Sequence, residues 1–68
     1  MMEISIRDEY IKLGQLLKLA GLTGSGLESK VEIINEQVKL NGEVETRRGK
    51  KVVKGDIVEY KGNIIKVI

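Results

Sequence analysis

The sequence predicts an α+β fold in which two helices pack against a small, mostly antiparallel sheet of about four or five short strands. Apolar residues recur with a helical period over residues 12–36 and with a period of two after residue 38. Glycine-containing turns then divide the second half into short segments. A chain of 68 residues has the length of one domain, 1–68, with one small core.

The chain is predicted to begin with a short strand and a helix. Residues 3–6 place two isoleucines on one face, which favours a strand. Over residues 12–20, four apolar residues lie at i, i+3, i+4 and i+7, which predicts a helix with one apolar stripe. These four residues are Leu13, Leu16, Leu17 and Ala20.

A second helix is predicted over residues 25–36. Ser25 and Glu28 have the spacing of a capping box, in which the hydroxyl accepts from a free amide and the carboxylate reaches back. The short link between the two helices makes them packed neighbours. The stripe expected to face the core consists of Leu27, Val31 and Ile34.

The second half of the chain is predicted to form antiparallel strands. A strand at 38–40 runs into Asn41-Gly42, the strongest short signal for a two-residue hairpin turn. The strand returns over 43–45, and the residues after it resemble an exposed loop. Two further strands are expected at 57–60 and 64–68, joined by a turn at 61–63.

The composition argues against most enzyme classes. Without cysteine there is no thiolate nucleophile, disulfide or cysteine-based zinc site, and without histidine the commonest general base is missing. A serine–lysine dyad with Lys30 is the remaining arrangement, in a chain too short for a closed pocket. We therefore expect no enzyme activity, cofactor or small-molecule substrate. No apolar run spans a membrane and no signal peptide opens the chain, so we expect a cytoplasmic protein without membrane contact.

Positive charge is concentrated in the second half of the chain. Residues 1–36 carry four basic and six acidic side chains, whereas residues 37–68 carry eight basic and four acidic ones. Residues 46–51, here called the basic loop, hold Arg47, Arg48, Lys50 and Lys51 without an acid between them. Such a run is either a solvated loop or a site for phosphate groups.

A second candidate for phosphate binding is the glycine-rich start of the second helix. Leu27 and Glu28 stand where a nucleotide-binding loop needs lysine and a hydroxyl residue, which argues against ATP or NAD. Backbone amides near Ser25 and Gly26 still suit a single phosphate, with Lys30 one turn further on. The alternative is that Ser25 is only a cap and the glycines form only a turn.

Aromatic residues are nearly absent. Only Tyr10 and Tyr60 are present, whereas surfaces that stack single-stranded bases use several aromatic rings. Nucleic-acid binding is therefore expected to read backbone and shape, which favours structured RNA. We interpret the two tyrosines as packing residues at the core edge.

These features resemble the S-four domain, also called the alpha-L RNA-binding motif, and its small stand-alone bacterial members in particular. The Asn-Gly hairpin and the later Gly-Asp pair, at this distance, are the more specific part of the resemblance. The segments that match are Leu16–Ala20, Ser25-Gly26 with Lys30, Val38–Glu43, Arg47–Lys51 and Gly55–Val58.

The resemblance implies that the two helices and the adjoining hairpin form an RNA-facing surface. Leu27 and Glu28 depart from the arginine that many members carry near this helix start, and Glu32 and Glu36 add negative charge, which shifts weight onto the basic loop. The RNA-binding residues that the resemblance indicates are Lys18, Ser25, Gly26, Lys30, Arg47, Arg48, Lys50 and Lys51.

We therefore expect a non-enzymatic protein that binds structured RNA through its backbone. The expected partner is ribosomal RNA or the ribosome, during assembly or in a ribosome-associated function. One alternative is a protein-interaction module that uses an exposed sheet edge. Another is an enzyme subunit that lacks its catalytic domain, since the domain is often appended to modifying enzymes.

Overall fold

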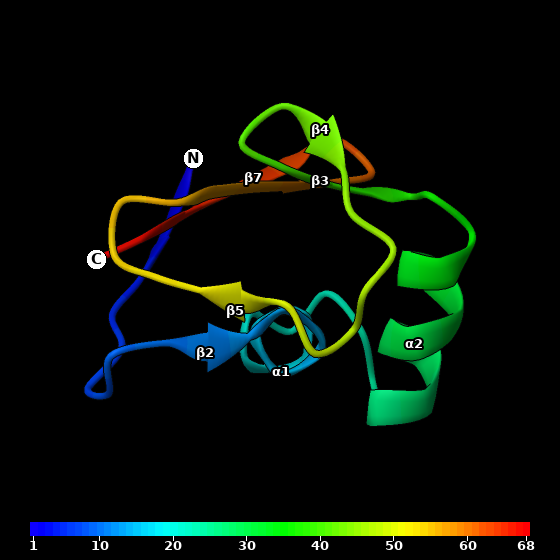
Figure 1. Ribbon diagram of the computed structural model, residues 1–68, viewed down its shortest axis with the longest axis horizontal. Coiled ribbons are helices and arrows are strands. Elements are labelled where there is room, and N and C mark those ends of the chain that lie inside the picture. Colours follow the sequence, from blue (N-terminus) through cyan, green and yellow to red (C-terminus); the bar gives the residue numbers. More distant parts are fainter.

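The computed structural model describes residues 1–68 and contains a five-stranded sheet, a two-stranded sheet and two helices. Figure 1 shows the larger sheet along the top of the view, with the helices and the smaller sheet below it. The order of strands across the larger sheet is β1 (Met2–Ile4), β7 (Asn63–Val67), β6 (Ile57–Tyr60), β3 (Val38–Leu40) and β4 (Glu43–Val44).

The larger sheet is mostly antiparallel, as predicted. Only the pair between the N-terminal β1 and the C-terminal β7 is parallel, with Met2 opposite Ile65. The pairs β7–β6, β6–β3 and β3–β4 are all antiparallel. The first and last strands of the chain therefore lie side by side at one edge of the larger sheet.

The smaller sheet was not predicted. It consists of β2 (Ile11–Lys12) and β5 (Lys51–Val52), which pair antiparallel with Lys12 opposite Lys51. Two-residue strands are too short to show a period of two, so these residues carry no local strand signal. Because β5 begins at Lys51, the last residue of the basic loop, the pairing fixes that loop beside the start of the first helix.

The predicted stripe of the first helix faces the core. The helix α1 spans Leu13–Leu19, and three of its four leucines, Leu13, Leu16 and Leu17, are fully buried. Ala20, just beyond the helix, is partly buried against them. The rest of the core comes mainly from the two sheets and consists of Ile6, Ile33, Val38, Val52, Val58, Tyr60, Ile65 and Val67.

The inward face predicted for the second helix is wrong. In α2 (Gly26–Ile34), Leu27, Val31 and Ile34 are 70%, 48% and 53% exposed. The opposite face is buried instead, through Ser29 and Ile33. Both sets of residues have helical spacing. The prediction chose the more apolar set as the inward face, and the structure buries the other one.

A buried hydrogen bond accounts for the observed orientation of α2. The hydroxyl groups of Thr23 and Ser29 bond to each other, and both residues are buried. Because the Ser29 side chain is small, α2 can pack closely against its neighbours. The Ser29 hydroxyl has its hydrogen-bond partner in Thr23 of the preceding loop. The loop between the helices is thus fixed to the first turns of α2.

The predicted Asn41-Gly42 hairpin turn is confirmed. Both residues have positive φ, 51° and 86°, as a type I′ turn requires. Lys61 and Gly62 form a second turn of this kind between β6 and β7, with φ of 45° and 82°. Neither helix has the length and apolar character needed to cross a bilayer.

Candidate nucleic-acid interface

A small hollow collects groups from α1, from the start of α2 and from the basic loop. It has a volume of about 420 Å³, and no apolar side chain lines it. We call it the polar hollow. Its lining residues are Lys12, Gly14, Gln15, Lys18, Gly26, Arg48 and Gly49. Three of these side chains are cationic and none is acidic, so the hollow suits an anion.

The basic loop reaches the hollow because it caps α1. The amide of Leu13 donates to the carbonyl oxygen of Lys50 at 2.9 Å, and the amide of Gly14 donates to that of Arg48 at 3.1 Å. The first amides of a helix have no partner within the helix, so these carbonyls satisfy two of them. The loop is therefore fixed against the first turn of α1.

Gly14 leaves the space that the Arg48 side chain occupies. A Cβ atom at this position would lie 2.7 Å from Cγ of Arg48, which is closer than side chains tolerate. A glycine within a helix costs stability. Here it allows Arg48 to lie across α1 toward the polar hollow.

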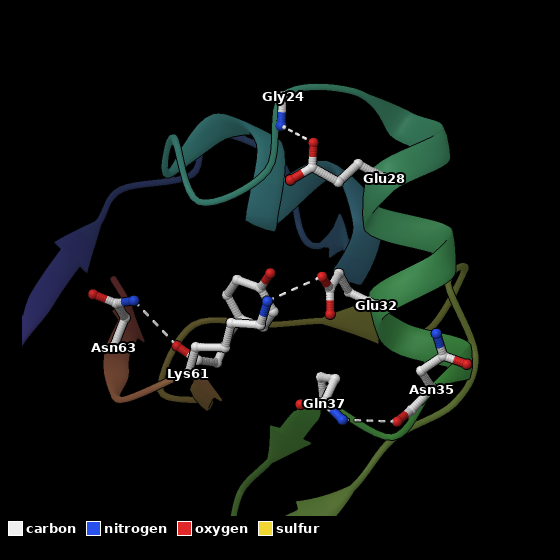
Figure 2. Close-up of polar contacts among 8 residues, drawn as sticks. Gly24, Glu28, Glu32, Asn35, Gln37, Lys61 and Asn63 are labelled. Carbon is white, nitrogen blue, oxygen red and sulfur yellow. Dashed lines mark hydrogen bonds and ion pairs between the residues drawn. The ribbon is translucent and has the colours of Figure 1, made fainter.

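The start of α2 is capped by its own side chains. The amide of Glu28 donates to Oγ of Ser25 at 3.1 Å, which confirms Ser25 as the N-cap. Oε2 of Glu28 accepts from the amide of Gly24 at 3.2 Å (Figure 2). Of the donors expected at this helix start, Gly26 alone lines the polar hollow. Ser25 caps the helix and does not line the hollow.

A second acidic residue of α2 is also engaged within the chain. Nζ of Lys61, in the turn between β6 and β7, lies 3.2 Å from Oε1 of Glu32 (Figure 2). This contact raises the pKa of Lys61, mainly through its hydrogen bond to Glu32. The pair ties α2 to the larger sheet. Lys30, by contrast, is exposed on α2 and lines neither the polar hollow nor any other.

The four cations of the basic loop do not share one face. Arg47 pairs with Glu45 through two hydrogen bonds, 2.9 Å from Nε to Oε2 and 3.0 Å from Nη2 to Oε1. The hydrogen bond to Arg47 lowers the pKa of Glu45, and the same contact raises the pKa of Arg47. The positive charge of Arg47 is thus balanced within the chain.

Two lysines of the loop lie with Arg47. Lys50 and Lys51 line a separate hollow of about 480 Å³, which also contains Glu43, Glu45 and Asp56. Nζ of Lys51 additionally lies 4.9 Å from the ring centroid of Tyr10. Among the residues expected from the sequence, the structure therefore brings Lys18, Gly26 and Arg48 together at the polar hollow.

Four lining residues of the polar hollow were not predicted from the sequence, namely Lys12, Gly14, Gln15 and Gly49. Lys12, Gln15 and Lys18 lie three residues apart, which places them on one exposed side of α1, and this spacing is visible in the sequence. Gly14 gave no signal, because its role depends on the loop that packs over it. Lys12 also faces the like charge of Lys51 across β2–β5, an arrangement that an anion relieves.

The chain belongs to the S4 domain family. The family model matches residues 4–68, nearly the whole chain. A relative from Escherichia coli K12, named "Putative RNA-binding protein YbcJ", is 41% identical over 59 residues, which cover 87% of this chain and 84% of the relative. A relative from Bacillus subtilis 168, named "Probable ribosome maturation protein RlbA", is 46% identical over 59 residues, with coverage of 87% and 83%.

A solved structure confirms the fold. The chain superimposes on the solution structure of YbcJ from E. coli with a TM-score of 0.77 and 38% sequence identity, covering 100% of this chain and 87% of that one. That structure is described as containing an alpha-L motif involved in RNA binding. The alpha-L fold expected from the sequence is therefore correct.

Proposed function

We propose that this protein binds structured RNA through the phosphate backbone, and that its target is ribosomal RNA. The observation that supports this most is the polar hollow, where Lys18, Gly26 and Arg48 converge from three separate elements. A wall with three cations and no acid suits a phosphodiester group. The names of the relatives YbcJ and RlbA point in the same direction.

In this proposal the polar hollow holds one phosphate group. Arg48 offers a planar guanidinium that matches two phosphate oxygens, whereas Lys12 and Lys18 act as mobile charges on either side. Gly26 opens α2, whose N-terminal end favours an anion. The absence of a side chain at Gly26 lets the phosphate approach the backbone.

The remaining cations contact the neighbouring backbone of the RNA. Lys30 on α2 and Lys50 and Lys51 of the basic loop extend the surface, whereas Arg47 contributes less because Glu45 holds its guanidinium. Ser25 acts indirectly, by holding the helix start in place. The interaction selects RNA by shape, and the protein carries out no reaction itself. We propose that it acts in the cytoplasm, in ribosome assembly or on the ribosome.

Salt titration tests the proposed mode of binding. With about 4–6 phosphate contacts, the logarithm of the affinity for a labelled RNA hairpin should fall against the logarithm of salt concentration with a slope of roughly −3 to −5. Replacing all four loop cations by alanine should flatten the slope by about 2–4. A slope that these substitutions leave unchanged contradicts a role for the loop.

Crosslinking in cells tests the proposed target. Covalent capture followed by sequencing of the attached transcripts should enrich ribosomal RNA beyond its abundance. Partners recovered from lysate should also be lost after nuclease treatment. Partners that survive nuclease, together with crosslinks that only follow transcript abundance, would support the alternative of a protein-interaction module.

A further inference from the structure

A second, larger hollow adjoins the polar hollow. It has a volume of about 940 Å³ and lies between the segment that leads into β2 and the exposed side of α1. We call it the Tyr10 hollow. Its apolar walls are formed by Ile6, Tyr10, Ile11 and Leu19. Leu19 is 60% exposed and Tyr10 is 38% exposed, so apolar surface is open to solvent here.

The two hollows form one continuous surface. Lys12, Gln15 and Lys18 line both of them, so the exposed side of α1 is the ridge between the two. On one side of this ridge the lining is entirely polar. On the other side it contains an aromatic ring and three aliphatic side chains.

This division matches the two parts of a nucleotide. A phosphate needs cations and backbone donors, whereas a base needs flat apolar surface with a few polar groups at its edge. Asp8 also lines the Tyr10 hollow. Its carboxylate can accept a hydrogen bond from the amino group of a base, and Arg7 beside it offers donors for the acceptor groups of a base edge.

Tyr10 is held in place by a neighbouring cation. Nζ of Lys51 lies 4.9 Å from the ring centroid, within the range of a cation–π contact. Lys51 does not line the Tyr10 hollow, whereas the tyrosine does. The ring is therefore fixed from one side by β5 while it contributes to the wall of the hollow.

We propose that the Tyr10 hollow takes the base of an unpaired nucleotide, whose own phosphate group lies in the polar hollow. This inference rests on the proposed RNA binding and specifies its target, a stem with a bulged or flipped-out nucleotide. The volume lies within the range of about 300–1,000 Å³ for small-molecule sites. The site also gives Tyr10 a role beyond the packing expected from the sequence.

Two RNA hairpins with the same stem test this inference, one fully paired and one with a single unpaired adenosine. The wild-type protein should bind the bulged hairpin at least about fivefold more tightly, as measured by fluorescence anisotropy. Tyr10→Ala should remove this preference and leave the affinity for the paired hairpin unchanged. Tyr10→Phe, which keeps the ring, should retain the preference.

Two further variants complete the design. Leu19→Ala removes apolar surface from the other wall without disturbing the tyrosine, and it should also reduce the preference for the bulged hairpin. Ile34→Ala removes a comparably exposed apolar side chain from α2 that lines neither hollow, and it should have no effect.

The outcomes separate the two proposals. A wild-type protein that binds both hairpins equally, or a preference that survives both Tyr10→Ala and Leu19→Ala, overturns the base site and leaves backbone binding intact. Variants of Tyr10 and Leu19 that lose equal affinity for both hairpins also overturn the base site. Variants that leave both RNA affinities unchanged overturn it as well, and would mean that the Tyr10 hollow serves another ligand, such as an acidic peptide. A wild-type protein that binds neither hairpin refutes the RNA-binding function itself.

Discussion

Asn41 and Asp56 are 15 residues apart in the chain and bond side chain to side chain, with Nδ2 of Asn41 donating to Oδ1 of Asp56 at 3.0 Å. Oδ1 of Asn41 accepts from the amide of Ile57, and Oδ2 of Asp56 accepts from the amide of Val53. The Asn-Gly and Gly-Asp pairs are thus one structural unit. This unit joins the two ends of the segment that contains the basic loop.

We expect Asp56→Ala to lower the free energy of unfolding by about 1–3 kcal/mol. The substitution removes two hydrogen bonds, each worth about 0.5–1.5 kcal/mol. Asn41→Ala should cost at least as much, because residue 41 has a φ of 51° that alanine disfavours. Urea unfolding measures both. Asp8→Ala is a matched control that removes an exposed carboxylate without a hydrogen bond, and a loss as large as that of Asp56→Ala would refute the prediction.

The buried pair of Thr23 and Ser29 should behave as a coupled unit. Ser29→Ala leaves the Thr23 hydroxyl buried without a partner, which should cost about 1–3 kcal/mol. In the double variant Ser29→Ala/Thr23→Val both hydroxyls are gone, so its loss should be smaller than the sum of the two single losses. Denaturant unfolding of all four proteins measures the coupling. Simple additivity would contradict it.

Gly14→Ala should weaken RNA binding while it leaves the stability of the fold nearly unchanged. Alanine favours the helix by up to about 1 kcal/mol, but its Cβ displaces the Arg48 side chain. We therefore expect the free energy of unfolding to change by less than about 1 kcal/mol, while RNA affinity falls toward that of Arg48→Ala. The matched variant is Gly49→Ala, which adds the same methyl group to another residue of the polar hollow but has no neighbour within 4 Å, so Arg48 stays in place and the loss of affinity should be smaller. Full affinity in Gly14→Ala would show that the position of Arg48 is unimportant.

Releasing Arg47 should strengthen RNA binding. Glu45→Gln removes the carboxylate that pairs with Arg47, so the salt slope should steepen by up to about 1. Glu43→Gln is the matched control, because it removes the same charge from the same hairpin and breaks no ion pair. Equal changes in the two variants would mean that only net charge matters.

The Glu45–Arg47 pair should also give a defined pH dependence of stability. Because the pKa of Glu45 is lowered in the folded protein, its stabilising contribution is present above the unfolded value and is lost as pH falls through the folded value. Thermal unfolding should therefore show a difference between the wild type and Glu45→Gln at pH 7 that shrinks as pH falls below the ordinary value of about 4.5 and disappears below the lowered pKa of the folded protein. A difference that persists in acid would have another cause.

Strong local patterns predicted most of the fold. The stripe of leucines defined α1, and Asn41-Gly42 defined the central hairpin. The inward face of α2 was not predictable from apolar character, because Ser29 is buried through a hydrogen bond to a residue outside the helix. The strands β2 and β5 depend on pairing between distant residues and carry no local signal.

The candidate site was only partly predictable for a related reason. The run of cations in the basic loop is evident in the sequence, but the side on which each cation lies depends on tertiary contacts. Arg47 is turned to Glu45, whereas Arg48 packs over Gly14. Neither contact has a signature in the order of residues. The spacing of Lys12, Gln15 and Lys18 was the one available signal that the sequence reasoning left unused.

The division between Arg47 and Arg48 leads to the most direct test of the central claim, that the polar hollow holds a phosphate. The measurement is the salt dependence of RNA affinity for Arg48→Ala and Arg47→Ala, two variants that lose the same charge from adjacent positions. Arg48→Ala should flatten the slope by about 1, whereas Arg47→Ala should change it by much less. Equal slopes for the two variants, or a larger change for Arg47→Ala, would contradict the claim.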